Sequence, residues 1–116
     1  MSKNKKMKPV KRTDKELWSL TEKRIAEKNY VIKSHAKDRQ GERSITDIDI
    51  LDILENKKNR KRNRNKKKDI YEEGYADWKY CIEGMDLDEE NKIRVIISFD
   101  ESYLLIITVI RLDNRE

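Results

Sequence analysis

Two runs near the end of the chain decide the fold: Lys92-Ile-Arg-Val-Ile-Ile-Ser-Phe99 and Tyr103-Leu-Leu-Ile-Ile-Thr-Val-Ile-Arg111. Both are rich in β-branched residues, and only Asp100-Glu-Ser102 separates them. Strands joined by so short a connection are antiparallel neighbours, so the two runs predict a β-hairpin. Upstream, Trp78-Lys-Tyr-Cys-Ile-Glu83 alternates and is followed by an acidic connection, which predicts a further strand of an antiparallel meander.

The hairpin also predicts which side chains share a face. If Phe99 pairs with Tyr103, one face is wholly apolar and packs on the helices. Arg94 then lies on the opposite face, directly across from Thr108, and alternation places Lys79 on the same face. A strand arginine in that position has a simpler interpretation, as a surface residue paired with a nearby carboxylate such as Glu83 or Asp77.

The first half of the chain predicts helices. Thr13-Asp-Lys-Glu16 matches a capping box, and the apolar residues behind it predict an amphipathic helix over 13–28. Residues 30–33 predict a short extended segment, and Ser34 an N-cap for a helix over 35–42. Within 44–56 a broad apolar pattern predicts a buried helix, with Asp49 and Asp52 facing out. The expected fold is α+β: N-terminal helices packed on a twisted antiparallel sheet of three to four strands.

The distribution of charge divides the chain more clearly than its total does. The 116 residues are 44% charged, with 28 Lys and Arg against 23 Asp and Glu, for a net +5. Residues 1–12 hold six basic residues and 57–68 hold nine, and neither segment contains an acidic residue. Such blocks repel themselves and lack apolar residues for a core. We therefore expect a disordered basic arm at 1–12 and a single α+β domain at 13–116, with a basic loop at 57–68.

Several classes of protein do not fit the composition. The only cysteine, Cys81, excludes an internal disulfide and a cysteine-cluster zinc site. With three glycines in the chain there is no glycine-rich phosphate loop, and metal-ligand spacing is absent, so we expect neither cofactor nor metal. The longest apolar run, at 104–107, is far too short to span a bilayer, and no apolar segment follows the basic N-terminus. We expect a cytoplasmic protein without membrane contact.

Five residues are candidates for chemistry. His35 is the only histidine, its imidazole titrates near neutrality, and Arg39 follows four residues later on the same helical face. If this helix begins on the Arg94 side of the sheet, its N-terminus would surround an anion cavity together with Arg39, Arg94 and Lys79. Thr108, a hydroxyl beside Arg94, is the fifth candidate. The simpler interpretation is a cap-region histidine beside a solvated arginine.

The basic segment predicts contacts with nucleic acid. Nine cations in twelve residues would bind backbone phosphates with a steep salt dependence. It has no aromatic residues among them, so base recognition is not expected. The candidate RNA-binding residues are Lys57, Lys58, Arg60, Lys61, Arg62, Arg64, Lys66, Lys67 and Lys68. A solvated loop without a ligand is the alternative.

Short motifs resemble a known group of domains. They are Ser34-His35-Ala36-x-x-Arg39, Ser44-Ile45-Thr46-x-x-Asp49, Tyr80-x-Ile82-Glu83-Gly84-x-Asp86, Arg94-Val95-x-Ile97 and Ile107-Thr108-Val109. Over residues 30–112 the chain resembles a small family of bacterial domains of unknown function, similar to the RelE, MqsR and BrnT toxins and often found beside zinc-finger antitoxins. The resemblance implies a RelE/barnase-like fold and metal-independent cleavage of mRNA, neutralised by a cognate antitoxin. The resemblance leaves out the first helix and both basic segments, so it implies no role for the basic loop.

Three functions remain open at this point. The first is the toxin component of a toxin–antitoxin system, an endoribonuclease acting on mRNA, free or ribosome-bound, with the five candidate residues as its catalytic cluster. The second is a non-catalytic RNA- or ribosome-binding module that uses residues 57–68. The third is an interaction domain whose acidic body meets a basic partner.

Overall fold

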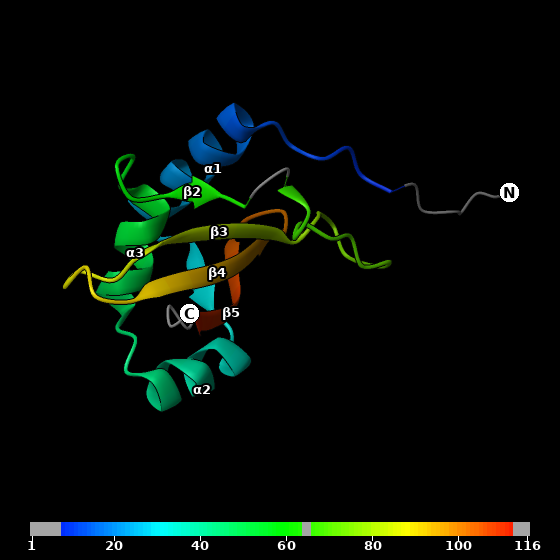
Figure 1. Ribbon diagram of the computed structural model, residues 1–116. Helices are drawn as coiled ribbons and strands as arrows, with labels where there is room; N and C mark the ends of the chain where they lie inside the picture. Colours follow the sequence, from blue (N-terminus) through cyan, green and yellow to red (C-terminus); the bar gives the residue numbers. More distant parts are fainter. Residues whose placement is uncertain (1–7, 64–65, 113–116) are drawn as a thin grey trace, which may run out of the picture.

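The computed structural model describes residues 8–63 and 66–112. Within these residues the helices come mostly first and the strands mostly last, with three helices and five strands in all (Figure 1). In order they are α1 (Asp14–Ala26), β1 (Tyr30–Ile32), α2 (Ser34–Arg43), α3 (Asp47–Glu55), β2 (Lys61–Arg62), β3 (Tyr80–Met85), β4 (Lys92–Phe99) and β5 (Leu104–Leu112). The α+β class expected from the sequence is confirmed.

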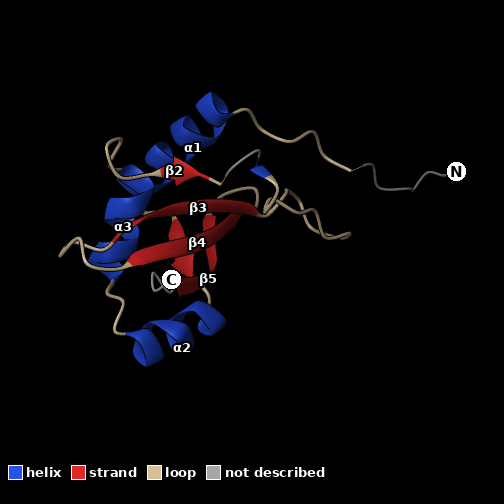
Figure 2. Cartoon of the chain, in the orientation of Figure 1, coloured by secondary structure: helices blue, strands red, loops and turns tan. Residues whose placement is uncertain are grey.

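The strands form one mixed sheet in the order β1-β5-β4-β3-β2. β1 pairs with β5 in parallel, and the other neighbours are antiparallel (Figure 2). The expected number of three to four strands and the purely antiparallel sheet were therefore wrong. The sequence predicted the meander and an extended segment at 30–33, but neither the pairing of β1 with the sheet nor β2, because these edge strands have only three and two residues.

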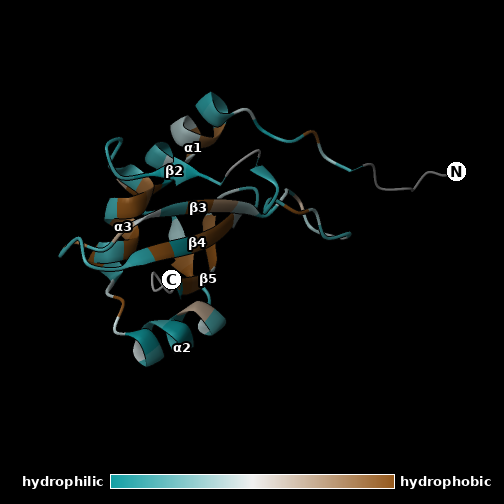
Figure 3. Cartoon of the chain, viewed as in Figure 1, coloured by the Kyte–Doolittle hydropathy of each residue, from teal (hydrophilic) through white to brown (hydrophobic). Residues whose placement is uncertain are grey.

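One face of the sheet packs against α1 and α3 and forms the core. Alternate residues of β4, Ile93 to Phe99, are buried there with Tyr80 and Ile82 of β3 and with Leu17 and Ile53 of the helices. Figure 3 shows the apolar colour on α3, on β5 and on parts of β4, whereas β2 is hydrophilic. We call the opposite side of the sheet the outer face; β3 and β4 present Cys81, Glu83, Arg94 and Ile96 on it.

The turn of the β4–β5 hairpin is longer than the sequence suggested. The connection has four residues, because the Asp100 carboxylate accepts hydrogen bonds from the amides of Ser102 and Tyr103 and the Asp100 amide binds the carbonyl of Tyr103. Phe99 consequently pairs with Leu104 rather than with Tyr103, and the predicted register was wrong.

A β-bulge in β5 then returns Thr108 to the outer face and Val109 to the core face, as the sequence predicted. Ile97 pairs with Ile106 but Ile96 pairs with Thr108, so Ile107 is the extra residue of β5. Beyond the bulge the buried position of β5 is again Val109. Arg94 remains on the outer face as predicted, but it lies opposite Ile110 instead of Thr108.

Helices α1 and α3 begin at capping boxes, but two details of the helices differ from the prediction, the N-cap of α2 and the burial of Asp49. Capping boxes form at Thr13 of α1 and at Thr46 of α3. Ser34 is the first residue of α2 rather than its N-cap, which is Lys33. Asp49 was expected to face out, but it is 7% exposed, because its carboxylate accepts the amides of Thr46 and Leu87.

The described parts of both basic segments contact the rest of the domain. Residues 8–12 lie against the body, where Lys11 contacts Asp69 (3.1 Å) and Arg12 contacts Asp77 (2.7 Å). Residues 1–7 of the expected arm lie outside the described residues. The expected loop at 57–68 contains β2. The carboxylates that these basic residues contact belong to the same chain.

Candidate functional site

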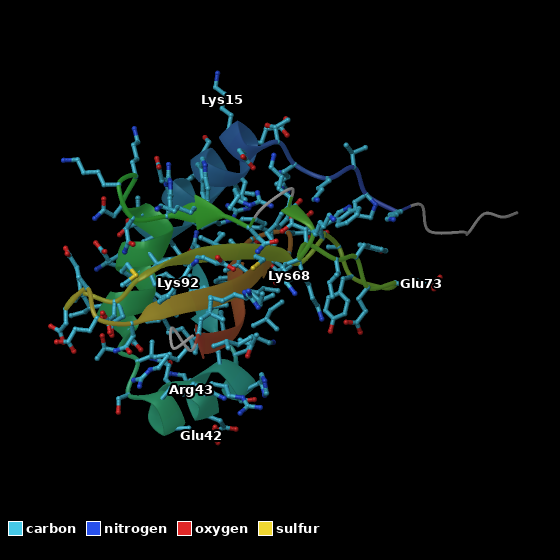
Figure 4. All side chains as sticks on the ribbon, viewed as in Figure 1. Lys15, Glu42, Arg43, Lys68, Glu73 and Lys92 are labelled. Carbon is cyan, nitrogen blue, oxygen red and sulfur yellow. The ribbon has the colours of Figure 1, made fainter. Side chains whose placement is uncertain are left out.

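A row of polar side chains crosses the outer face of the sheet. Lys61 of β2 pairs with Glu83 of β3, Glu83 pairs with Arg94 of β4, and Arg94 pairs with Ile110 of β5. Because residues paired across strands share a face, Lys61, Glu83 and Arg94 lie side by side. Lys92 lies two residues before Arg94 on the same face of β4 (Figure 4).

Glu83 is the centre of this row. Its carboxylate accepts a hydrogen bond from Arg94 Nε at 3.0 Å and lies 3.5 Å from Lys92 Nζ. Asn63 Nδ2 also lies 3.5 Å from it. The Glu83 side chain is only 8% exposed, whereas Arg94 is 21% and Lys92 45% exposed. The carboxylate is thus buried beneath cations whose outer parts reach solvent.

The environment keeps Glu83 ionised. Burial raises the pKa of this carboxyl group, but the hydrogen bond and charge of Arg94, together with Lys92, outweigh burial, so the pKa lies below its usual 4.5. One carboxylate therefore contacts two cations, Arg94 and Lys92, and Lys61 is its neighbour in the strand register, so cations outnumber the carboxylate in this row. Such a cluster can attract a phosphate and supply an ionised group able to accept a proton.

Three of the predicted site residues share this outer face, but they are less concentrated than expected. Thr108 pairs with Ile96, so it is a diagonal neighbour of Arg94. Lys79 precedes β3 and binds Glu72 (2.5 Å), with its ammonium 4.8 Å from the centre of the Tyr75 ring. The ammonium of Lys79 is therefore held at the 70–79 connection rather than at Glu83.

The other two predicted residues lie on α2, which packs along β5. His35 is exposed, and its side chain makes no hydrogen bond to any residue within 8–63 and 66–112. Arg39 pairs with Glu42 at 3.1 Å in an exposed i,i+3 contact of the kind that exchanges readily with solvent. No described contact joins either residue to Arg94 or Lys79, so the five-residue cluster is not assembled within the part of the chain that the structure describes.

The basic segment divides into structural and surface cations. Arg60 binds Glu22 of α1 (2.7 Å), and its guanidinium lies 4.3 Å from the centre of the Trp18 ring. Arg62 binds Asp14 (2.7 Å) and Asp69. Both arginine side chains are less than 9% exposed. Their charges anchor β2 to the body and are not available at the surface.

The remaining cations of this segment differ in their setting. Lys66 contacts Asp14 (3.2 Å), and Arg64 lies outside the described residues. The lysines at 57, 58, 61, 67 and 68 are exposed.

Cys81 lies on the outer face beside Glu83 but is poorly suited to chemistry. It is fully buried, and burial above all raises the pKa of its thiol to about 11. The thiol is therefore protonated at neutral pH and a weak nucleophile. Among residues 8–63 and 66–112, no group of three or more His, Cys, Asp or Glu side chains could hold a metal ion.

Sequence reasoning did not identify Glu83 and Lys92 as members of the site. Glu83 appeared only as an alternative surface partner of Arg94, and Lys92 only as the start of a strand. Strand alternation places both on the correct face, but their meeting depends on the β3–β4 register, in which Met85 pairs with Lys92. The sequence held one usable signal: if the strands on either side of the Asp86–Asn91 connection form a hairpin, Met85 pairs with Lys92 and Glu83 with Arg94.

One family comparison covers most of this architecture. The sequence pattern of a domain of unknown function, DUF4258, matches residues 32–111, more than two thirds of the chain. The chain belongs to the DUF4258 family. No curated protein and no solved structure shows a significant match to it.

The DUF4258 match includes every strand that carries the outer-face row and the whole basic segment, and it begins at the end of β1. The arm and α1 lie outside it. Glu22 and Asp14 of α1 form ion pairs with Arg60 and Arg62. A segment outside the family match therefore stabilises β2 of this DUF4258 protein. None of the helices at residues 8–63 and 66–112 is long and apolar enough to cross a membrane.

Proposed function

We propose that this DUF4258 domain is a cytoplasmic, metal-independent endoribonuclease and the toxin component of a bacterial toxin–antitoxin system, related to the RelE, MqsR and BrnT toxins. The observation that carries the proposal is the buried, ionised Glu83 held under Arg94 and Lys92 on the outer face. A carboxylate beside several cations suits the cleavage of a phosphodiester through the ribose 2′-hydroxyl, which needs a base and charge stabilisation.

In the proposed reaction the Glu83 carboxylate accepts the proton of the 2′-hydroxyl. The 2′-oxygen bonds to phosphorus and the bond from phosphorus to the 5′-oxygen breaks, leaving a cyclic phosphate and a 5′-hydroxyl end. Arg94 and Lys92 stabilise the added negative charge, and Thr108 bonds a phosphate oxygen. His35 and Arg39 come from α2, which packs along the strand that carries Thr108. We assign His35 the proton that the 5′-oxygen receives, and Arg39 a phosphate contact.

The proposed partners follow from this chemistry. The substrate is mRNA, free or on the ribosome, and a cognate antitoxin of the zinc-finger type neutralises the toxin. We leave Lys79 out of the phosphate contacts because Glu72 already binds its ammonium.

A second function has its own support. The exposed lysines of the 57–68 segment could bind RNA backbone without any cleavage, as a non-catalytic RNA- or ribosome-binding module. The two functions differ in a single observable, whether RNA is cut.

Two experiments test the proposal. In the first, the protein is expressed without any partner in a bacterial host, and growth and the integrity of cellular RNA are measured. In the second, purified protein is incubated with RNA in the presence of a metal chelator, and cleavage of the RNA is measured. The wild type should arrest growth and fragment mRNA. Arg94→Ala, Glu83→Gln and His35→Ala should each reduce cleavage, with Arg94→Ala slower by about 10²–10³-fold. Lys15→Ala on α1, far from β4 in Figure 4, is the matched loss of a surface cation and should behave as wild type.

Folding must be checked for Arg94→Ala, because it leaves Glu83 buried without its main cation. Glu83→Gln keeps the shape of the side chain and separates loss of chemistry from loss of structure. Equal toxicity of the wild type and both folded variants would contradict the proposed site. A wild type that binds RNA but cuts none would favour the binding module instead.

A further inference from the structure

The cations on the two faces of β2 differ in their contacts and in their exposure to solvent. Strand alternation points Arg62 to the core face, where it pairs with Ile82 in register and binds Asp14. Lys61 points to the outer face, where it pairs in register with Glu83 and remains exposed. A segment that looks uniform in sequence therefore presents only part of its charge to the outer face.

A cavity of about 140 Å³ lies where the outer-face cations converge. Lys58, Lys61 and Lys92 line it, together with Glu83 and the backbone at Gly84. Arg94 and Lys92 already contact the one carboxylate. The volume is several times the ~30 Å³ that a water molecule occupies in the liquid, so a tetrahedral anion fits with some of its water.

We propose that this cavity is a subsite for a backbone phosphate of single-stranded RNA, one that flanks the phosphate at Glu83 and Arg94. Its position in the reaction rests on the proposed ribonuclease function, but its ability to bind phosphate does not. Lys58, Lys61 and Lys92 contact the phosphate oxygens. The residues lining the cavity include no aromatic side chain, so the subsite grips the backbone without reading bases.

The proposal divides the basic segment in two. Lys58 and Lys61 bind RNA, whereas Arg60 and Arg62 hold β2 in place. Lys15 and Lys28 lie outside both the cavity and this segment, and Figure 4 shows Lys15 on α1, away from Lys92. They carry the same charge and are exposed, so they serve as matched controls.

The experiment measures the salt dependence of binding to a single-stranded RNA whose 2′-hydroxyls are methylated, so that it cannot be cut. Lys58→Gln, Lys61→Gln and Lys92→Gln should each lower the slope of log affinity against log salt by about 0.7, the value for one phosphate contact on a single strand. Lys15→Gln and Lys28→Gln should leave the slope near that of the wild type. Equal losses in all five variants, or no loss in the first three, would overturn the subsite.

A second titration with inorganic phosphate tests the cavity alone. Backbone amide resonances of Lys61, Gly84 and Lys92 should shift with added phosphate, and those of Lys15 and Lys28 should not. If the lysine variants lose slope while the wild type cuts no RNA, the subsite stands and the ribonuclease proposal fails. If the wild type cuts RNA but the three lysines behave like the controls, the ribonuclease proposal stands and the subsite fails.

Discussion

At the scale of single residues, Glu83 is the side chain on which the outer face depends. It is a charged group that is almost completely buried, and its cost of burial is offset by Arg94 and Lys92. Its pKa lies below the usual value, so the folded protein holds this proton more weakly than the unfolded chain does. Its contribution to stability is therefore present above pH 4.5 and is lost as the pH falls through the folded pKa.

Glu83→Gln should remove this part of the pH dependence. At neutral pH the variant should be less stable than the wild type, and the difference should shrink as the pH falls below 4.5, where the wild-type carboxylate becomes protonated. Denaturant unfolding at a series of pH values measures the difference. Glu73→Gln, at an exposed position in the 70–79 connection, is the control and should keep the wild-type profile. A constant difference between Glu83→Gln and the wild type at every pH would contradict the interpretation.

At the scale of elements, β2 shows how two residues of strand complete a sheet edge. β2 pairs with β3 only at Glu83 and Ile82. The next amide of β3, that of Cys81, donates a hydrogen bond to the Asp69 carboxylate at 2.9 Å instead. β2 and Asp69 meet at Arg62, which binds Asp69 and α1. The segment is therefore part of the fold, and deleting 57–68 would remove structure as well as charge.

Arg62→Gln and Lys61→Gln should consequently differ sharply in stability. The first leaves the buried side chain of Asp69 with Lys11 as its one cationic partner among residues 8–63 and 66–112, and we expect it to lower the free energy of unfolding by about 2–4 kcal/mol. The second changes an exposed side chain and should stay within about 0.5 kcal/mol of the wild type. Urea unfolding of the two variants provides the comparison, and similar midpoints would show that Arg62 does not anchor β2.

At the scale of the whole molecule, basic segments form ion pairs with carboxylates of the acidic remainder of the same chain. Arg12 lies at the end of the sheet, where its side chain binds Asp77 and its amide donates to the Tyr80 hydroxyl at 3.0 Å. The Tyr80 hydroxyl in turn donates to Asp77 at 2.7 Å. Burial above all suppresses ionisation of Tyr80 and raises its pKa well above 10.0, so the tyrosine stays a neutral donor in this network. The arm thereby completes the polar contacts of a buried aromatic residue.

Arg12→Ala should therefore destabilise the domain even though the residue precedes its first helix. Asp77 is buried and Arg12 is about one third exposed, so the loss lies between those of exposed and buried ion pairs, about 1–3 kcal/mol. Val10→Ala, two residues earlier and 90% exposed, should leave the thermal midpoint unchanged. Scanning calorimetry of both variants decides the matter, and a wild-type midpoint for Arg12→Ala would mean that the arm rests on the body without stabilising it.

The sequence by itself determined the local features of this protein. The alternation of 92–99 and the apolar run at 103–111 predicted the central hairpin, and the capping box at Thr13 predicted the start of α1. Arg94 was placed on the correct face of its strand, since a period of two residues is a property of the strand alone.

Only the tertiary structure decided which groups meet. Alternation sets the face of a residue but not its offset along the neighbouring strand, so the four-residue turn and the bulge at Ile107 changed the partner of Arg94 from Thr108 to Ile110. Opposite charges far apart in sequence, such as Arg62 and Asp14, find each other only when the chain is compact, because ion pairing depends on distance in space. For that reason composition could count the cations of 57–68, whereas the fold decided which of them hold β2 and which face the solvent.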